Sequence, residues 1–155
     1  MLMMAGSAMA VRVQTKPVIP FTTRLGTIEE YNAVVHPPAS LFAADRRRLV
    51  LVAYTASWCD SKCTSLLRAY KDVAAYFSRM KLFSEVVIAE CVADELGAQH
   101  LAEDGVRHFP MVIIYGSHLS ERDVFQGDVS DREAMIDFTK NHLLRLHEFR
   151  RDSDL

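Results

Sequence analysis

The segment Leu49–Tyr54 limits the possible folds more than any other part of this sequence. It reads Leu-Val-Leu-Val-Ala-Tyr and contains no charged residue. An unbroken apolar run of this length is typical of a central strand that is buried on both faces. The following segment, from about Asp60 to Met80, carries apolar side chains at helical spacing. A buried strand followed by an amphipathic helix predicts an α/β fold with helices packed on the sheet.

The rest of the chain continues this alternation. Capping patterns at Thr27–Glu30 and Ser130–Glu133 predict two helix starts, and Gly105 predicts a helix end. The expected elements are a short strand over 18–22, a helix from 27 to about 35, strands over 86–92, 110–115 and 122–127, and helices over 94–104 and from 130 onward. This order predicts a mixed sheet, parallel in its first part, that ends in an antiparallel pair.

Length and charge exclude several classes of protein. The 155 residues fit one domain, and 18 Lys and Arg against 20 Asp and Glu leave a net charge of -2. We therefore expect no nucleic-acid surface, because such surfaces are strongly basic. No apolar run approaches the ~20 residues that a membrane span needs. The predicted organisation is an N-terminal arm over 1–17, a domain over 18–147 and a charged tail over 148–155.

The three cysteines favour a reducing compartment, because an odd and small number does not make a disulfide-stapled scaffold. The expected location is cytoplasmic. An alternative is mitochondrial, since residues 1–28 contain Arg12, Lys16 and Arg24 but no acid, as transit peptides do.

Three local segments, in this order and at these separations, resemble the thioredoxin family over about residues 18–147. They are the strand that leads into Trp58-Cys59, the segment Gly105–Pro110, and Phe125-Gln126-Gly127 before the last helix. The resemblance implies a thioredoxin-like sandwich with a central mixed sheet and a cis peptide bond at Pro110. It also implies a reactive corner at Trp58-Cys59, with Pro110 beside it.

A thiol–disulfide enzyme needs a cysteine at a helix N-terminus, where the helix dipole favours the thiolate. Cys59 fits that position, with Trp58 flanking it and Cys63 as the resolving thiol. Cys63 lies four residues after Cys59, whereas the family's second cysteine lies three residues after its first. Two cysteines at i and i+4 of a regular helix are ~5–6 Å apart at Cβ, too far for an unstrained disulfide. Closure remains open if Cys59 is a non-helical cap residue.

Two further departures concern proton transfer. The family keeps a buried carboxylate six residues before its first cysteine, and this chain has Ala53 there. The place where the family often keeps a lysine falls near Cys91. These departures weigh against efficient turnover, since the second half of the exchange needs a proton donor or acceptor.

The Cys-x-x-x-Cys spacing also allows a metal. Copper chaperones of the SCO type, which share the thioredoxin fold, use this spacing with a distal histidine. Under that alternative, Cys59, Cys63 and His108 would bind copper, since two thiolates and an imidazole suit that metal. A lone histidine is more often an ordinary surface residue, so no metal site and no cofactor are predicted.

Three functional hypotheses follow. The first is a structural or interaction domain with weak or no redox turnover, built into a larger assembly through its arm and tail. Family knowledge offers cytoskeletal assemblies, including microtubule-associated ones, and organellar complexes as candidates. The second hypothesis is a thiol–disulfide oxidoreductase that uses Cys59 and Cys63. The third is the copper site. Fold alone does not decide among them.

Overall fold

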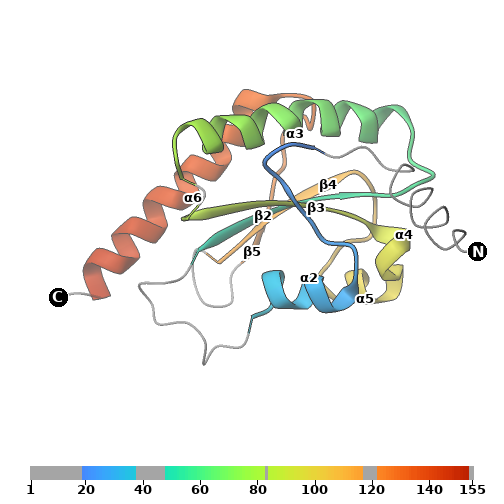
Figure 1. Ribbon diagram of the computed structural model, residues 1–155, viewed down its shortest axis with the longest axis horizontal. Helices are drawn as coiled ribbons and strands as arrows, with labels where there is room; N and C mark the ends of the chain where they lie inside the picture. Colours follow the sequence, from blue (N-terminus) through green and yellow to red (C-terminus); the bar gives the residue numbers. More distant parts are fainter. Residues whose placement is uncertain (1–18, 38–47, 83, 117–121, 154–155) are drawn as a thin grey trace, which may run out of the picture.

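A computed structural model describes residues 19–37, 48–82, 84–116 and 122–153, and every structural statement below refers to these residues. The fold centres on a sheet of five strands in the order β1-β3-β2-β4-β5 (Figure 1). The strands are β1 (Thr23–Arg24), β2 (Leu49–Thr55), β3 (Val86–Val92), β4 (Met111–Tyr115) and β5 (Arg122–Val124). Strands β1, β3 and β2 run parallel, whereas β4 and β5 run antiparallel to their neighbours. The predicted α/β sandwich with a mixed sheet is confirmed.

The central strand β2 matches its apolar sequence. All seven of its residues are buried, because β3 and β4 flank it and helices cover both of its faces. Its chain direction carries Thr55 toward the start of α3 (Ser61–Arg79), so the segment between them lies at the carboxyl end of the strand.

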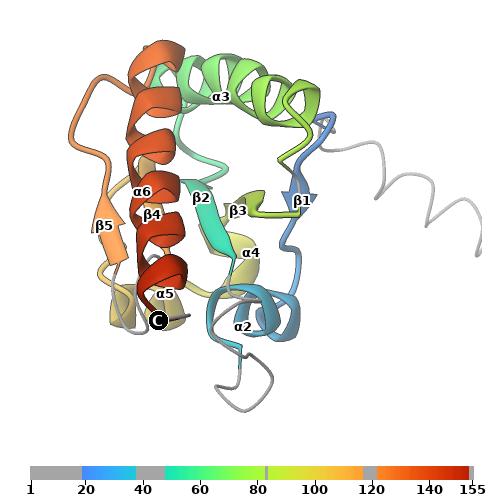
Figure 2. The ribbon, with the colours of Figure 1, turned by 90° about the vertical axis from the view of Figure 1, so that its left-hand side faces the viewer.

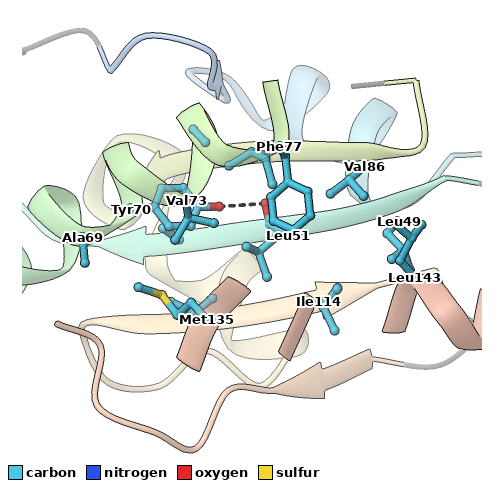
Figure 3. Packing of buried hydrophobic residues seen from close by; sticks show 14 of the residues in the cluster. Leu49, Leu51, Ala69, Tyr70, Val73, Phe77, Val86, Ile114, Met135 and Leu143 are labelled. Atoms are coloured by element: carbon cyan, nitrogen blue, oxygen red, sulfur yellow. Dashed lines mark hydrogen bonds between the residues drawn. The ribbon is translucent and has the colours of Figure 1, made fainter. Parts of the chain in front are cut away.

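Helices α3 and α6 (Arg132–Ser153) cover one face of the sheet (Figures 1 and 2). The side chains between them and the sheet are almost entirely apolar, and Figure 3 shows Phe77, Val86 and Leu51 in close packing. Some polar groups are buried on this face as well, among them Thr139 and His142 of α6. The hydroxyl group of Tyr70 lies 2.9 Å from the carbonyl oxygen of Leu51 and 2.7 Å from that of Ala89. Burial raises the pKa of Tyr70, so it stays neutral.

The opposite face is covered by α2 (Ile28–Val35), α4 (Ala93–Leu96) and α5 (Ala98–Glu103). Three tyrosine hydroxyl groups meet beneath these helices. The Tyr54 hydroxyl lies 2.8 Å from that of Tyr31 and 2.5 Å from that of Tyr115. Tyr31 also donates to the carboxylate of Asp104, which lies 2.9 Å from Nε2 of His36 at the C-terminus of α2. This face therefore holds a buried hydrogen-bonded network that ends at an exposed histidine.

The structure corrects the expected first strand. Within the predicted strand 18–22, Val18 lies outside the described residues, and Ile19–Thr22 forms a turn closed by a hydrogen bond from Thr22 N–H to Ile19 O. Pro20 cannot donate to a strand ladder and Phe21 has a φ of 68°, so neither suits a strand. The edge strand is Thr23–Arg24 instead.

Three other boundaries also differ. Gly97, with a φ of 92°, divides the expected helix 94–104 into α4 and α5. The last helix begins at Arg132, where the carboxylate of Asp131 accepts from the N–H of Ala134, so Asp131 caps it rather than Ser130. The same helix continues through Ser153, so its final turns include residues 148–153 of the predicted tail. The arm over 1–17 lies outside the described residues.

The expectation of no membrane span agrees with the described helices, none of which is long and apolar enough to cross a bilayer.

Candidate active site

The candidate site lies where β2 ends and α3 begins. The segment Ala56–Cys59 turns there, and the Cys59 N–H donates to Ala56 O at 3.0 Å. A disulfide bond joins Cys59 to Cys63, with their Cα atoms 5.7 Å apart. That separation lies in the usual range for disulfides.

Cys59 can reach Cys63 because it stands outside the helix. Helix α3 starts at Ser61, and its N-cap residue is Asp60, whose φ of −90° and ψ of −99° are not helical. The two cysteines are therefore not an i, i+4 pair of a regular helix. The sequence left closure open if Cys59 were a non-helical cap residue, whereas in the structure Asp60 is the cap and Cys59 lies one residue before it.

The two sulfur atoms differ in access. Cys59 is half-buried, whereas the Cys63 residue is only 3% exposed. Beside them, Trp58 is 67% exposed, and its ring meets that of Phe109 edge to face with centroids 5.7 Å apart. An attacking or departing thiol therefore meets Cys59 first, next to an exposed aromatic surface.

A groove opens beside the disulfide. The peptide bond Phe109–Pro110 is cis, as expected, and it places this loop against the first turns of α3. The groove has a volume of about 420 Å³, and three segments line it: the start of α3 (Ser61, Lys62, Ser65), the loop 108–110 and the segment 127–130 before α6. The predicted site residues Cys59, Cys63, Trp58 and Pro110 thus converge on one end of the sheet.

Comparison with known protein families identifies the fold. The thioredoxin family model matches residues 10–141 of the chain. The chain belongs to the thioredoxin family. No curated protein matches it.

Thioredoxin-fold structures are similar to it at low sequence identity. The J-Trx1 fragment of ERdj5 gives a TM-score of 0.62 at 19% identity, covering 81% of this chain and 51% of the fragment, so the chain spans about half of that length. Thioredoxin from Malassezia sympodialis gives 0.57 at 15%, covering 84% of this chain and 98% of the other. Deadhead, a germline-specific thioredoxin of Drosophila melanogaster, gives 0.54 at 18%, covering 77% and 98%. These likenesses support the fold alone.

The chain departs from the thioredoxin pattern at Ala53 of β2, six residues before Cys59. Ala53 is fully buried, so no carboxylate occupies that position. Its Cα partner on β3 is Glu90, which is only 5% exposed and which sequence reasoning missed. Glu90 accepts a hydrogen bond from the Thr22 hydroxyl at 3.1 Å and lies 3.6 Å from the Arg24 guanidinium. The available signal was the one acid inside the otherwise apolar run 86–92.

Burial raises the pKa of the Glu90 carboxyl group, and the hydrogen bond from Thr22 and the charge of Arg24 partly oppose that rise. Successive side chains of a strand point to opposite faces of the sheet. Ala89 and Cys91 point toward the face covered by α2, α4 and α5, so the side chain of Glu90 points toward α3. A buried acid, Glu90, therefore lies on the strand next to Ala53. Its carboxylate interacts with Thr22 and Arg24 at the β1 edge of the sheet.

The predicted copper ligands are not brought together. His108 is exposed and lines the groove, while Cys59 and Cys63 share a disulfide. In the described part of the chain, no three His, Cys, Asp or Glu residues are grouped so that they could hold a metal ion. The copper alternative therefore remains a prediction that concerns the reduced protein.

The third cysteine, Cys91, lies on β3, 1% exposed, and its thiol is free. Burial raises the pKa of this thiol to about 12. Because a nucleophilic cysteine must be a thiolate, Cys91 takes no part in the site.

Proposed function

We propose that this domain exchanges disulfides with partner proteins through Cys59 and Cys63. The observation that carries the proposal is the Cys59–Cys63 disulfide at the start of α3, whose first residues line a groove together with cis-Pro110. The start of a 19-residue helix adds to it, because unpaired N–H groups and the helix dipole there favour a thiolate at Cys59. The ring of Trp58 offers an apolar contact for the segment around a partner's cysteine.

The chemistry needs only the two thiols and a partner disulfide. In the reduced protein, the Cys59 thiolate attacks one sulfur of the partner disulfide, forms a mixed disulfide and releases one partner thiolate. The Cys63 thiolate then attacks the Cys59 sulfur, which restores the intramolecular disulfide and releases the second partner thiolate. Two electrons pass from the protein to the partner, and an external thiol must reduce the protein again.

A second candidate is a docking domain with little turnover. Ala53 favours it, because no acid stands where the family keeps one to move the proton of the second step. Under this candidate, the domain is a component of a larger assembly, either a cytoskeletal one or an organellar complex, and contacts its partners through the arm and the tail.

Insulin reduction with glutathione as electron donor separates the two candidates. We expect turnover by the wild-type protein, none by Cys59→Ser, and a trapped mixed disulfide with Cys63→Ser. Cys91→Ala is the matched control, since it removes a thiol with no access to solvent, and it should turn over like the wild type. Wild-type turnover no faster than that of Cys59→Ser would refute exchange and favour the docking domain.

A further inference from the structure

The loop that carries Cys59 is held by hydrogen bonds to one carboxylate, that of Asp94. The backbone N–H of Ser57 donates to Oδ1 of Asp94 at 2.9 Å, and the Ser57 hydroxyl donates to Oδ2 of the same residue. Asp94 belongs to α4, which follows β3, 37 residues farther along the chain. We propose that Asp94 is a positioning residue that holds the reactive loop and thereby sets the balance between the disulfide and dithiol forms of Cys59 and Cys63.

The loop has few other contacts that could hold it. Trp58, between Ser57 and Cys59, is 67% exposed, and its ring contact is with Phe109. The turn itself contributes the hydrogen bond from Cys59 N–H to Ala56 O. Because Cys59 precedes the helix, the helical ladder of α3 does not fix it either. Apart from the disulfide itself, the paired hydrogen bonds to Asp94 are therefore the main side-chain restraint on the loop that carries Cys59.

The restraint favours the disulfide form because it holds the loop in the arrangement in which the Cys59–Cys63 bond is formed, so less order is lost when that bond closes. Loss of Asp94 should therefore shift the equilibrium toward the dithiol.

This inference rests on the proposed function, because it concerns the same cysteine pair, but it can be measured without turnover. The wild type, Asp94→Ala, Asp94→Asn and Glu95→Ala are equilibrated with glutathione. Two glutathione thiols reduce the protein disulfide and become glutathione disulfide, and alkylation with mass detection gives the dithiol fraction. We expect Asp94→Ala to shift this equilibrium about tenfold toward the dithiol, the effect of a 30 mV change in potential.

The other two variants distinguish positioning from charge. Asparagine keeps an acceptor for the Ser57 N–H and an NH₂ group that the Ser57 hydroxyl can accept from, so Asp94→Asn should stay close to the wild type. Glu95→Ala removes the neighbouring negative charge on α4, which pairs with Arg24 at 3.1 Å, and should leave the equilibrium unchanged.

Two results would overturn the inference: an Asp94→Ala equilibrium equal to that of Glu95→Ala, or an Asp94→Asn shift as large as that of Asp94→Ala. If Asp94→Ala does not fold, Ser57→Ala removes only the hydroxyl contact and should shift the equilibrium in the same direction, and no shift would count against the proposal. An inactive wild-type protein in the insulin assay would refute exchange, yet the equilibrium measurement would still decide the role of Asp94.

Discussion

Helices α3 and α6 fill one face of the sheet with apolar side chains, whereas the face beneath α2 and α5 encloses three tyrosine hydroxyl groups. On the first face, the free energy of folding comes from burial and close packing, which depend on volume. On the second face, each hydroxyl must also keep a hydrogen-bond partner, because an unsatisfied polar group is costly inside a protein. The free energy of folding therefore depends mainly on side-chain volume on the first face, and also on individual hydroxyl groups on the second.

The largest effect is expected from a cavity on the α3–α6 face. Phe77 is 1% exposed within the apolar cluster, so Phe77→Ala should lower the free energy of unfolding by about 3–5 kcal/mol. Denaturant unfolding of the oxidised protein measures it, with Phe77→Leu as a control that keeps most of the volume. A loss for alanine no greater than that for leucine would show that packing does not dominate this face.

A smaller effect is expected when one oxygen atom is removed from the opposite face. Tyr54→Phe leaves the hydroxyls of Tyr31 and Tyr115 each without one partner and should cost about 1–3 kcal/mol. The matched control is Tyr76→Phe, a half-buried tyrosine on α3, which should be nearly neutral.

The double variant Tyr54→Phe with Tyr115→Phe tests whether these hydroxyls act as a network. It should cost less than the sum of the two single changes, because each change already breaks the shared hydrogen bond. Strict additivity would contradict the coupling.

The helix that covers the tyrosines offers a third test. Thr27 and Glu30 form a reciprocal capping box at the start of α2. Thr27→Ala should lower the free energy of unfolding by about 1 kcal/mol, whereas Thr27→Ser should restore most of it. Equal losses in both variants would indicate that the cap contributes nothing to this face.

The smallest effect should be one of pH, at Glu90. Burial raises the pKa of this carboxyl group above its ordinary value of 4.5, so the folded state keeps the proton to a higher pH than the unfolded state does. Its contribution to stability is fully present below pH 4.5 and is lost as pH rises through the pKa of the folded state. Glu90→Gln should therefore lose less stability than the wild type between pH 4.5 and neutrality, as unfolding curves at several pH values would show. Parallel pH profiles would contradict the prediction.

Local patterns explain what the sequence predicted correctly. The apolar run of β2 and the stripe of α3 are strong periodic signals, and the structure confirms both. The capping box at Thr27 is equally local. Pro110 and the place of Trp58-Cys59 came from the family resemblance, and the fold puts them together.

The remaining features depend on contacts between distant segments or on backbone angles. Closure of the Cys59–Cys63 disulfide required a non-helical Asp60, which the spacing of the cysteines does not reveal. The contact between Ser57 and Asp94 joins residues that are 37 positions apart, and no local pattern marks it. The tyrosine network likewise joins three separate elements, whose alignment only the sheet register establishes.

The buried position of Cys91 has a consequence for thiol chemistry on the intact fold. With a pKa of about 12, its thiolate fraction at pH 7 is about 10⁻⁵, and the side chain has no access to solvent. A reagent that alkylates thiolates should therefore label none of the three cysteines in the native oxidised protein, and after mild reduction it should label Cys59, the more exposed cysteine of the pair. The stoichiometry of labelling thus reads out the state of the Cys59–Cys63 pair directly, without any change to the sequence.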